Sequence, residues 1–307
     1  MLEPFDLSHL NGLALYLDLV PYEIGYRHLY DAAKLYGADN YDARVYEHYL
    51  QTGKQASTPK ELLARSLHDY CIRKALEDFM SGYDERRCVG VMGGHGLPRT
   101  DAQYAQIVML SKRLTEAGFL MITGGGPGAM EATHLGAWLA GRPVADVDAV
   151  LSYLSAYPSF ETGGWLSSAL EVCRQFPQVN DYTSLGVPTW LYGHEPSTPF
   201  ATHIAKFFDN SIREDFILTA AGAGVIFTPG SAGTLQEVFQ EAVQDHYLSF
   251  GYSSPMIFLG THFWRDIVPI YPLLESMMEQ GIYKNLILLL TDSEDQVCQM
   301  LSSNVKN

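Results

Sequence analysis

Cysteine is scarce in this chain of 307 residues, and its four cysteines lie far apart. Cys71, Cys88, Cys173 and Cys298 form no C-x-x-C pair, so no zinc or redox motif can be read from them. The plain interpretation is that they are reduced and mostly buried thiols of a cytosolic protein. We therefore expect a cytoplasmic location and no metal site.

Long apolar runs are also missing. No stretch approaches the roughly 18–20 residues that a membrane span requires. The apolar stretch from Leu13 to Val20 is interrupted by Asp18, is stopped by Pro21 and has no positively charged segment before it. These features are not those of a signal peptide, and we expect no membrane partner.

Positive charge is in the minority, since 20 Lys and Arg residues stand against 35 Asp and Glu, which gives a formal net charge of −15. Such an acidic surface argues against a nucleic-acid duplex or an anionic membrane as the partner. It does not argue against a small phosphate ligand, because local backbone dipoles can build that site. The apolar share of 47% fits a globular protein of one large domain or two.

Residues 1–85 are expected to form a helical N-terminal segment that carries no chemistry of its own. Thr58, Pro59 and Glu61 make a favourable helix start, with a capping residue, a proline in the first turn and an early acid. The residues after them recur mainly at steps of three and four, which predicts one inward face made of Leu62, Leu63, Leu67, Tyr70, Cys71, Lys74, Ala75 and Phe79.

From residue 86 onward, short apolar segments alternate with helical ones, which indicates a parallel sheet covered on both faces. The expected strands are 88–92, 119–123, 187–192, 225–228, 256–259 and 286–290. The expected helices are 101–117, 129–140, 200–221 and 233–247, two short ones within 141–181, one through Met278 and a last one ending near Leu301. We therefore predict a doubly wound, mainly parallel, Rossmann-like α/β domain over residues 86–307, with its ligand beyond the carboxyl ends of the strands.

Glycine-rich turns follow two of the early strands. Gly93, Gly94 and His95 come directly after the first strand and suit a ligand that approaches the backbone, although a glycine pair there is often only a turn. The second turn has glycines at Gly124, Gly125, Gly126 and Gly128 and opens a helix that carries Glu131 in its first turn. It matches neither the dinucleotide fingerprint nor a P-loop, so we predict a phosphate or ribose contact. Glu131 is a candidate ligand residue, or it simply favours the helix dipole.

A third turn, from Pro229 to Glu237, is the sharpest motif. Its N–H and hydroxyl donors at a helix start suit a phosphate, and its candidate binding residues are Gly230, Ser231, Ala232, Gly233 and Thr234. The alternative is a capping box, in which Thr234 and Glu237 close open N–H groups of the first helical turn.

Arg213 is a further candidate, on the long helix expected before this motif. It either reaches the ligand or forms an ordinary surface pair with Asp209, four residues earlier.

Together these residues resemble the LOG family, whose signature is P-G-G-x-G-T-x-x-E with an upstream Arg and a G-G-G turn after the second strand. The resemblance covers about residues 86–301, on Pro229–Glu237, Arg213 and Gly124–Gly126. Ser231 replaces the second glycine of P-G-G. The family hydrolyses nucleoside 5′-monophosphates to a free base and ribose 5-phosphate, and the resemblance implies that activity, without identifying the base.

By the same resemblance, Glu237 and Arg213 are the catalytic candidates, and the glycine-rich turns hold the phosphate and the ribose. The resemblance also implies a homodimer or a larger even-numbered oligomer. A non-catalytic nucleotide sensor or carrier of the same fold is the alternative.

No cofactor is expected. A pyridoxal phosphate enzyme needs a lysine for its Schiff base. From residue 86 onward the lysines are Lys112, Lys206, Lys284 and Lys306, and none lies in a glycine-rich turn.

Overall fold

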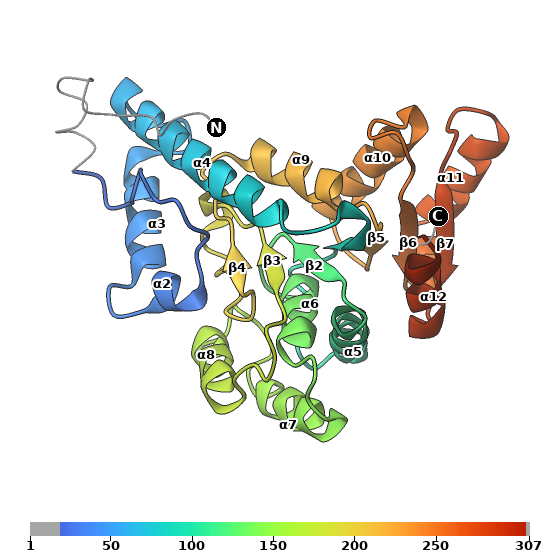
Figure 1. The fold of residues 1–307 in the computed structure, drawn as a ribbon, viewed down its shortest axis with the longest axis horizontal. Helices are drawn as coiled ribbons and strands as arrows, with labels where there is room; N and C mark the ends of the chain where they lie inside the picture. The colour runs from blue at the N-terminus through green and yellow to red at the C-terminus, as the bar shows by residue number, and fades with distance from the viewer. Residues whose placement is uncertain (1–18, 305–307) are drawn as a thin grey trace.

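The computed structural model describes residues 19–304 (Figure 1). Most of the apolar stretch 13–20, the first 18 residues of the expected N-terminal segment and the last three residues of the expected α/β domain lie outside them. Within residues 19–304, no helix has the length and apolar character needed to cross a membrane.

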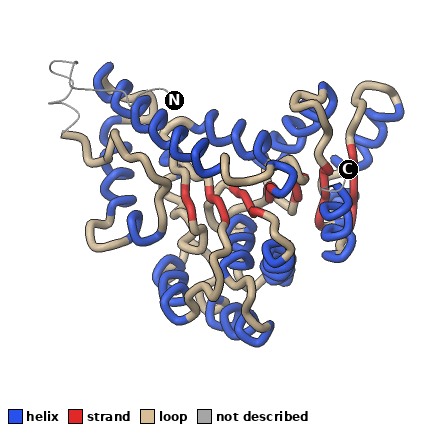
Figure 2. The backbone as a smooth tube through the Cα atoms, viewed as in Figure 1, coloured by secondary structure: helices blue, strands red, loops and turns tan. Residues whose placement is uncertain are grey.

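The described residues form one seven-stranded sheet in the order β4-β3-β2-β1-β5-β6-β7, and every neighbouring pair is parallel. The strands are β1 Cys88–Met92, β2 Leu120–Thr123, β3 Ser184–Gly186, β4 His203–Ile204, β5 Gly224–Phe227, β6 Pro255–Leu259 and β7 Ile287–Thr291. The order runs one way from β1 to β4 and the other way from β5 to β7, so the sheet reverses between β1 and β5. Helices lie on both sides of the strands (Figure 2). The predicted doubly wound parallel α/β fold is confirmed.

The two faces of the sheet bury two apolar clusters, because strand residues point to alternate sides. Ile122 and Phe227 belong to the first cluster, and their neighbours Met121 and Ile226 belong to the second. The helices of this part are α5 Ala102–Glu116, α6 Ala129–Trp138, α7 Val144–Leu154, α8 Trp165–Gln175, α9 Asn210–Ala220, α10 Ala232–Tyr247, α11 Ile270–Glu279 and α12 Glu294–Asn304. The two short helices expected within 141–181 are α7 and α8.

Two predictions between residues 184 and 221 are wrong. The strand expected at 187–192 lies earlier, as β3, and a short 3-10 helix, η3 (Trp190–Tyr192), stands in its place. The long helix expected at 200–221 begins only at Asn210, because the carboxylate of Asp209 accepts the N–H of Ser211 and caps α9 there. The residues before it form a turn and then the short strand β4, in which Ile204 pairs with Gly186 of β3.

The N-terminal segment contains α2 Ala32–Tyr36, α3 Tyr41–Thr52 and α4 Pro59–Met80. Its apolar residues are buried in the same cluster as one face of the sheet, since Val45 and Ile72 share that cluster with Ile204 and Phe227. An isolated antiparallel bridge between Tyr30 and Ile204 extends the sheet edge. In Figure 1, α2 and α3 lie on the β4 side of the sheet, and α4 extends from that side across the picture above the strands.

Helix α4 begins as predicted, but only part of the predicted inward face is buried, with Ala75 inside and Leu67 and Phe79 packed against the core. Thr58 caps it by accepting the N–H of Glu61 at 3.2 Å. Leu62 and Leu63, expected inside, are 57% and 42% exposed. The buried side instead carries four ionisable residues, Glu61, Arg65, His68 and Asp69, together with Ala64, Ile72, Ala75 and Leu76. The inward face was only partly predicted, because its polar groups also gain partners from other elements, such as Thr52 for Arg65 and the N–H of Phe208 for Asp69.

Two acids on α10, Glu241 and Asp245, are buried one helical turn apart. Ser254 hydrogen-bonds one oxygen of each, and the other oxygens, Glu241 Oε2 and Asp245 Oδ2, have no hydrogen-bond partner. Burial, with the charge of Asp245 adding to it, raises the pKa of Glu241 to about 8. Burial likewise raises the pKa of Asp245 to about 7.

This pair predicts a pH-dependent stability. Because the pKa of Glu241 is raised on folding, its stabilising effect is full below about pH 4.5 and is lost as the pH rises through about 8. We expect Glu241→Gln to lie within about 1 kcal/mol of the wild type at pH 5 and to exceed its free energy of unfolding by up to about 4–5 kcal/mol at pH 9. Denaturant unfolding at both pH values measures this difference, and parallel wild-type and variant curves would contradict it.

Candidate functional site

A cavity of about 240 Å³ lies at the carboxyl ends of β1 and β5, where the strand order reverses. Its size is just below the range of about 300–1,000 Å³ usual for small-molecule pockets. Its walls are Val91, Met92, Gly93, Gly94, His95, Gly124, Met130, Tyr192, Glu195, Arg213, Glu214, Ser231, Gly233, Thr234 and Glu237. All three glycine-rich turns therefore contribute to one cavity.

The N-terminus of α10 forms one wall. The helix begins at Ala232 after Ser231, and no described side chain caps it. Free N–H groups and the positive end of the helix dipole are thus presented beside Ser231, Gly233 and Thr234, which suits an anion. Gly230 lies behind this wall, where a Cβ would come within 2.1 Å of the Thr234 hydroxyl.

The alternative capping box is not formed. Since Thr234 is the third residue of α10, it and Glu237 both lie inside the helix and not at its cap. Glu237 is therefore not engaged in capping, and its side chain lines the cavity.

The turn after β2 supports the guanidinium of Arg213. A Cβ on Gly124 would lie 2.2 Å from Arg213 Nη2, so only glycine lets the guanidinium lie against this turn. Gly125 and Gly128 adopt φ values of +70° and +69°, which favour glycine. Gly124 borders the cavity, whereas Gly125, Gly126 and Gly128 shape the turn behind it.

The turn after β1 holds the other two turns together. Gly94 N–H donates to the carbonyl of Pro229 at 3.1 Å, and the carbonyl of Gly94 accepts from Ala129 N–H at 3.2 Å. At Gly93, a Cβ would come within 1.9 Å of the Thr228 hydroxyl. His95 is half exposed at the rim, with Nδ1 3.6 Å from Glu195 Oε1.

Glu237 and Arg213 both line the cavity, and the ion pair of Arg213 is with Glu214, whose Oε1 lies 3.8 Å from Arg213 Nη1. Burial raises the pKa of the half-buried Glu237 to about 7, while the positive charge of Arg213 lowers it and the negative charge of Glu214 adds to the rise. Arg213 Nε donates to the carbonyl of Val187 at 3.1 Å. The alternative surface pair with Asp209 is not the contact that Arg213 makes, because the Asp209 carboxylate caps α9 instead.

Glu131 does not line the cavity, in contrast to the prediction. It is fully buried and pairs with Arg99, whose Nε donates to Oε2 at 3.0 Å and whose Nη2 donates to Oε1. The hydroxyl of Tyr104 donates to Oε2 at 2.9 Å. Its position in the first turn of α6 also matches the helix-dipole alternative. Ala232, another candidate, opens α10 but is not among the lining residues.

The sequence interpretation missed six lining residues: Val91, Met92, Met130, Tyr192, Glu195 and Glu214. Glu214 could have been found, because it adjoins Arg213. Tyr192 and Glu195 belong to a loop that no motif marks. Within residues 19–304, no group of three or more His, Cys, Asp or Glu side chains is arranged to hold a metal ion.

No family model and no curated protein matches the chain. Among solved structures, it is similar to TM1055, a structural genomics target, with a TM-score of 0.45 and 18% identity over 71% of this chain and 99% of that one. It is also similar to the molybdenum cofactor carrier protein from Chlamydomonas reinhardtii (TM-score 0.43, 15% identity, 72% and 99%). A third is the molybdenum cofactor binding protein from Rippkaea orientalis (0.40, 14%, 70% and 95%). At these values the fold assignment rests on the strand order, and membership of the LOG family stays a prediction.

Proposed function

We propose that the protein is a nucleoside 5′-monophosphate phosphoribohydrolase, which cleaves the N-glycosidic bond to a free base and ribose 5-phosphate. The observation that carries this proposal is the position of Glu237. A half-buried carboxylate with a pKa of about 7 faces the same small cavity as an uncapped helix N-terminus and an arginine. A site that only binds an anionic ligand has no need of such a carboxylate, because its negative charge repels the ligand. The presence of Glu237 therefore favours a catalytic role.

In this proposal the 5′-phosphate binds at the start of α10. The N–H groups beside Ser231 and Gly233 and the hydroxyl of Thr234 are its donors. In a chain of net charge −15, these fixed dipoles supply the local attraction that the overall charge does not. The ribose lies between this wall and Gly124, which brings its anomeric carbon toward Glu237.

Hydrolysis then develops positive charge on the sugar as the bond from the anomeric carbon to the base nitrogen breaks. The Glu237 carboxylate stabilises that oxocarbenium character and takes a proton from the attacking water. Oxygen from the water bonds to the anomeric carbon, the departing base takes up a proton from solvent, and Glu237 returns the proton of the water to solvent before the next turnover. Arg213 fixes the base or polarises it as a leaving group.

The pH dependence of hydrolysis tests this role. Because Glu237 must be ionised and its pKa is about 7, we expect kcat/KM to rise about tenfold per pH unit below pH 7 and to level off above about pH 8. Glu214→Gln should move this limb to lower pH, since it removes a negative charge that raises the pKa of Glu237.

A binding control separates this limb from the titration of the nucleotide itself, whose phosphate has a second pKa near ~6. Calorimetric titration of AMP into Glu237→Gln over the same pH range measures only the effect of the phosphate titration on binding. If the rise in kcat/KM with pH follows the binding curve, or occurs at the same pH in Glu214→Gln, Glu237 is not the catalytic base.

The second candidate function is a nucleotide sensor or carrier without turnover. It is favoured by one observation, which is that the α10 N-terminus and the glycine-rich turns make a phosphate site without any help from Glu237. A carrier would bind nucleoside monophosphates and release them intact.

A further inference from the structure

The buried polar face of α4 is connected to the start of α9, the helix that carries Arg213. α4 belongs to the N-terminal segment, and α9 follows the β4 edge of the sheet more than a hundred residues later. Charged groups at such an interface are costly to bury unless they are paired. The hydrogen-bond partners of these charged groups therefore show which parts of the chain α4 fixes.

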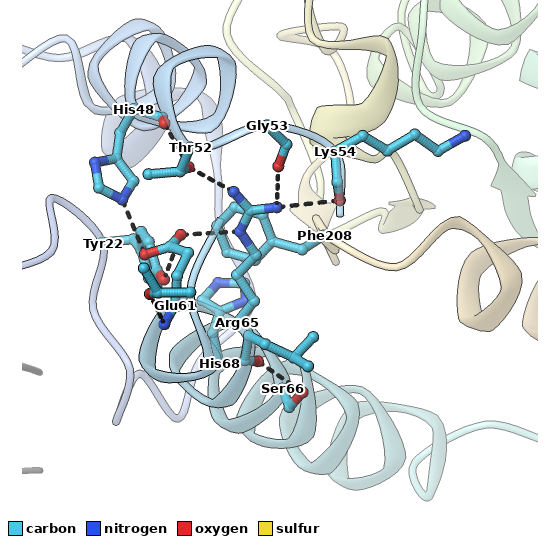
Figure 3. A network of polar contacts seen from close by, with 12 residues as sticks. Tyr22, His48, Thr52, Gly53, Lys54, Glu61, Arg65, Ser66, His68 and Phe208 are labelled. Atoms are coloured by element: carbon cyan, nitrogen blue, oxygen red, sulfur yellow. Dashed lines mark hydrogen bonds and ion pairs between the residues drawn. The ribbon is translucent and has the colours of Figure 1, made fainter. Parts of the chain in front are cut away.

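One set of contacts fixes α4 against α3 (Figure 3). Glu61 accepts from Arg65 Nε at 2.9 Å and from the Tyr22 hydroxyl at 3.1 Å. Arg65 also donates to the Thr52 hydroxyl at 2.6 Å and to the carbonyl of Gly53 at 2.9 Å. Because the Arg65 guanidinium bonds both to Glu61 of its own helix and to the end of α3, α4 has a defined orientation relative to α3. This orientation places the next residues of α4.

Asp69, one turn further along α4, reaches the chain just before α9. Its two carboxylate oxygens accept the N–H of Phe208 at 3.0 and 3.1 Å, and Oδ2 accepts the N–H of Asp209 at 2.9 Å. Oδ1 also hydrogen-bonds His68 Nδ1 at 2.8 Å. Asp69 is only 4% exposed, so these charge-assisted bonds are little weakened by water.

These bonds act where α9 begins. Asp209 is the capping residue of α9, and Arg213 lies in the first turn and a half of that helix. Asp69 thus holds the backbone of the residue that starts the helix. The position of that start decides where the Arg213 guanidinium meets Gly124 and the carbonyl of Val187.

Apolar packing provides only part of this connection, since the Phe208 ring packs against His68 of α4 with ring centroids 5.0 Å apart. A second cavity of about 800 Å³ separates α4 from the first turn of α9, and its walls include Asp69, Phe208, Asp209, Asn210 and Ile212. Because the space between the two helices is open there, α4 reaches the backbone at the start of α9 through the hydrogen bonds to Asp69, beside the packing of the Phe208 ring. The second cavity adjoins the first through Tyr192 and Glu214.

We propose that Asp69 is a positioning residue, which sets Arg213 in the candidate active site by fixing the start of α9. The helical N-terminal segment is then a working part of the site. The effect on catalysis rests on the proposed function, whereas the effect on α9 does not.

The test compares Asp69→Asn with Asp78→Asn in the full-length protein. Asn keeps the shape of Asp69 but turns one acceptor into a donor that faces backbone N–H groups. Asp78 is an exposed acid of the same helix and serves as the matched control. Asp69→Glu is a milder variant that keeps the charge and moves it by one methylene, in case Asp69→Asn does not fold.

Hydrogen–deuterium exchange measures the positioning without any substrate. We expect amides in 208–216 to exchange at least about tenfold faster in Asp69→Asn, and also faster in Asp69→Glu, with no change in Asp78→Asn. In base-release assays we expect kcat of Asp69→Asn to fall by about 10- to 100-fold. KM should stay within about threefold of wild type, because the phosphate wall on α10 does not touch Asp69.

Wild-type exchange of 208–216 in the Asp69 variants would overturn the inference, and so would an unchanged kcat despite faster exchange. A fall in kcat without faster exchange would also overturn it, since Asp69 would then act by another route. If the wild type hydrolyses no nucleotide, the proposed function fails, and the exchange result alone decides whether Asp69 positions α9.

Discussion

Replacing Glu237 by Gln is expected to lower kcat for base release by about 10²- to 10⁴-fold, which is the usual effect of removing a positioned acid or base. Gln keeps the size of the side chain but can neither take a proton from water nor stabilise positive charge on the sugar. Because no described side chain caps α10, and Glu237 lies inside the helix, the substitution removes no helix cap. Steady-state assays with chromatographic detection of the base measure the loss.

Folding should be preserved in this variant. Burial raises the pKa of Glu237 to about 7, so its ionisation is unfavourable to the folded state, and a neutral Gln does not destabilise it. Glu279→Gln, an exposed change at the end of α11, is the matched control and should keep wild-type kcat. Near-normal hydrolysis by Glu237→Gln would show that the catalytic carboxylate is elsewhere.

Replacing Glu131 by Ala is expected to cost about 3–5 kcal/mol in the free energy of unfolding, as is typical when one partner of a buried ion pair is removed. The guanidinium of Arg99 would stay buried, with its remaining contacts to Ser168 and to the carbonyl of Trp165 but without a negative charge. Denaturant unfolding measures the loss.

The double variant Arg99→Met with Glu131→Leu provides the control, because replacing both partners by apolar groups leaves no charge unpaired. It should recover most of the lost stability. The KM of the folded Glu131 variant for a nucleotide should match the wild type, since Glu131 does not line the cavity. A raised KM with unchanged stability would restore Glu131 as a ligand-binding residue.

The sheet could be predicted from the sequence wherever a strand is a short apolar run, buried on both faces and followed by glycine or proline. β1 coincides with the predicted 88–92, β2 and β6 differ from prediction by one residue at one end, and β5 and β7 are each shifted by one residue. β3 and β4 have only three and two residues, too few for any periodicity to show. Phe208 lies four residues before Ile212, as in a helix, but it enters the core from the chain before α9 begins.

The glycine-rich turns of the site could be predicted because glycine marks close backbone approach within a few residues of sequence. The supporting groups could not, because their partners are distant in sequence. Nothing near Asp69 indicates that its acceptors serve the N–H groups of residues 208 and 209. Similarly, the pairing of Glu131 with Arg99 depends on how α6 packs beside the loop that carries Arg99.

The most direct test incubates the purified protein with AMP, GMP, IMP, CMP, UMP and an N6-substituted AMP, and separates the products by chromatography. The proposed hydrolysis predicts free base and ribose 5-phosphate in equal amounts from at least one of them, with the release lost in Glu237→Gln. Recovery of every nucleotide intact, with binding still detected as a thermal shift, would contradict it and favour the sensor or carrier function.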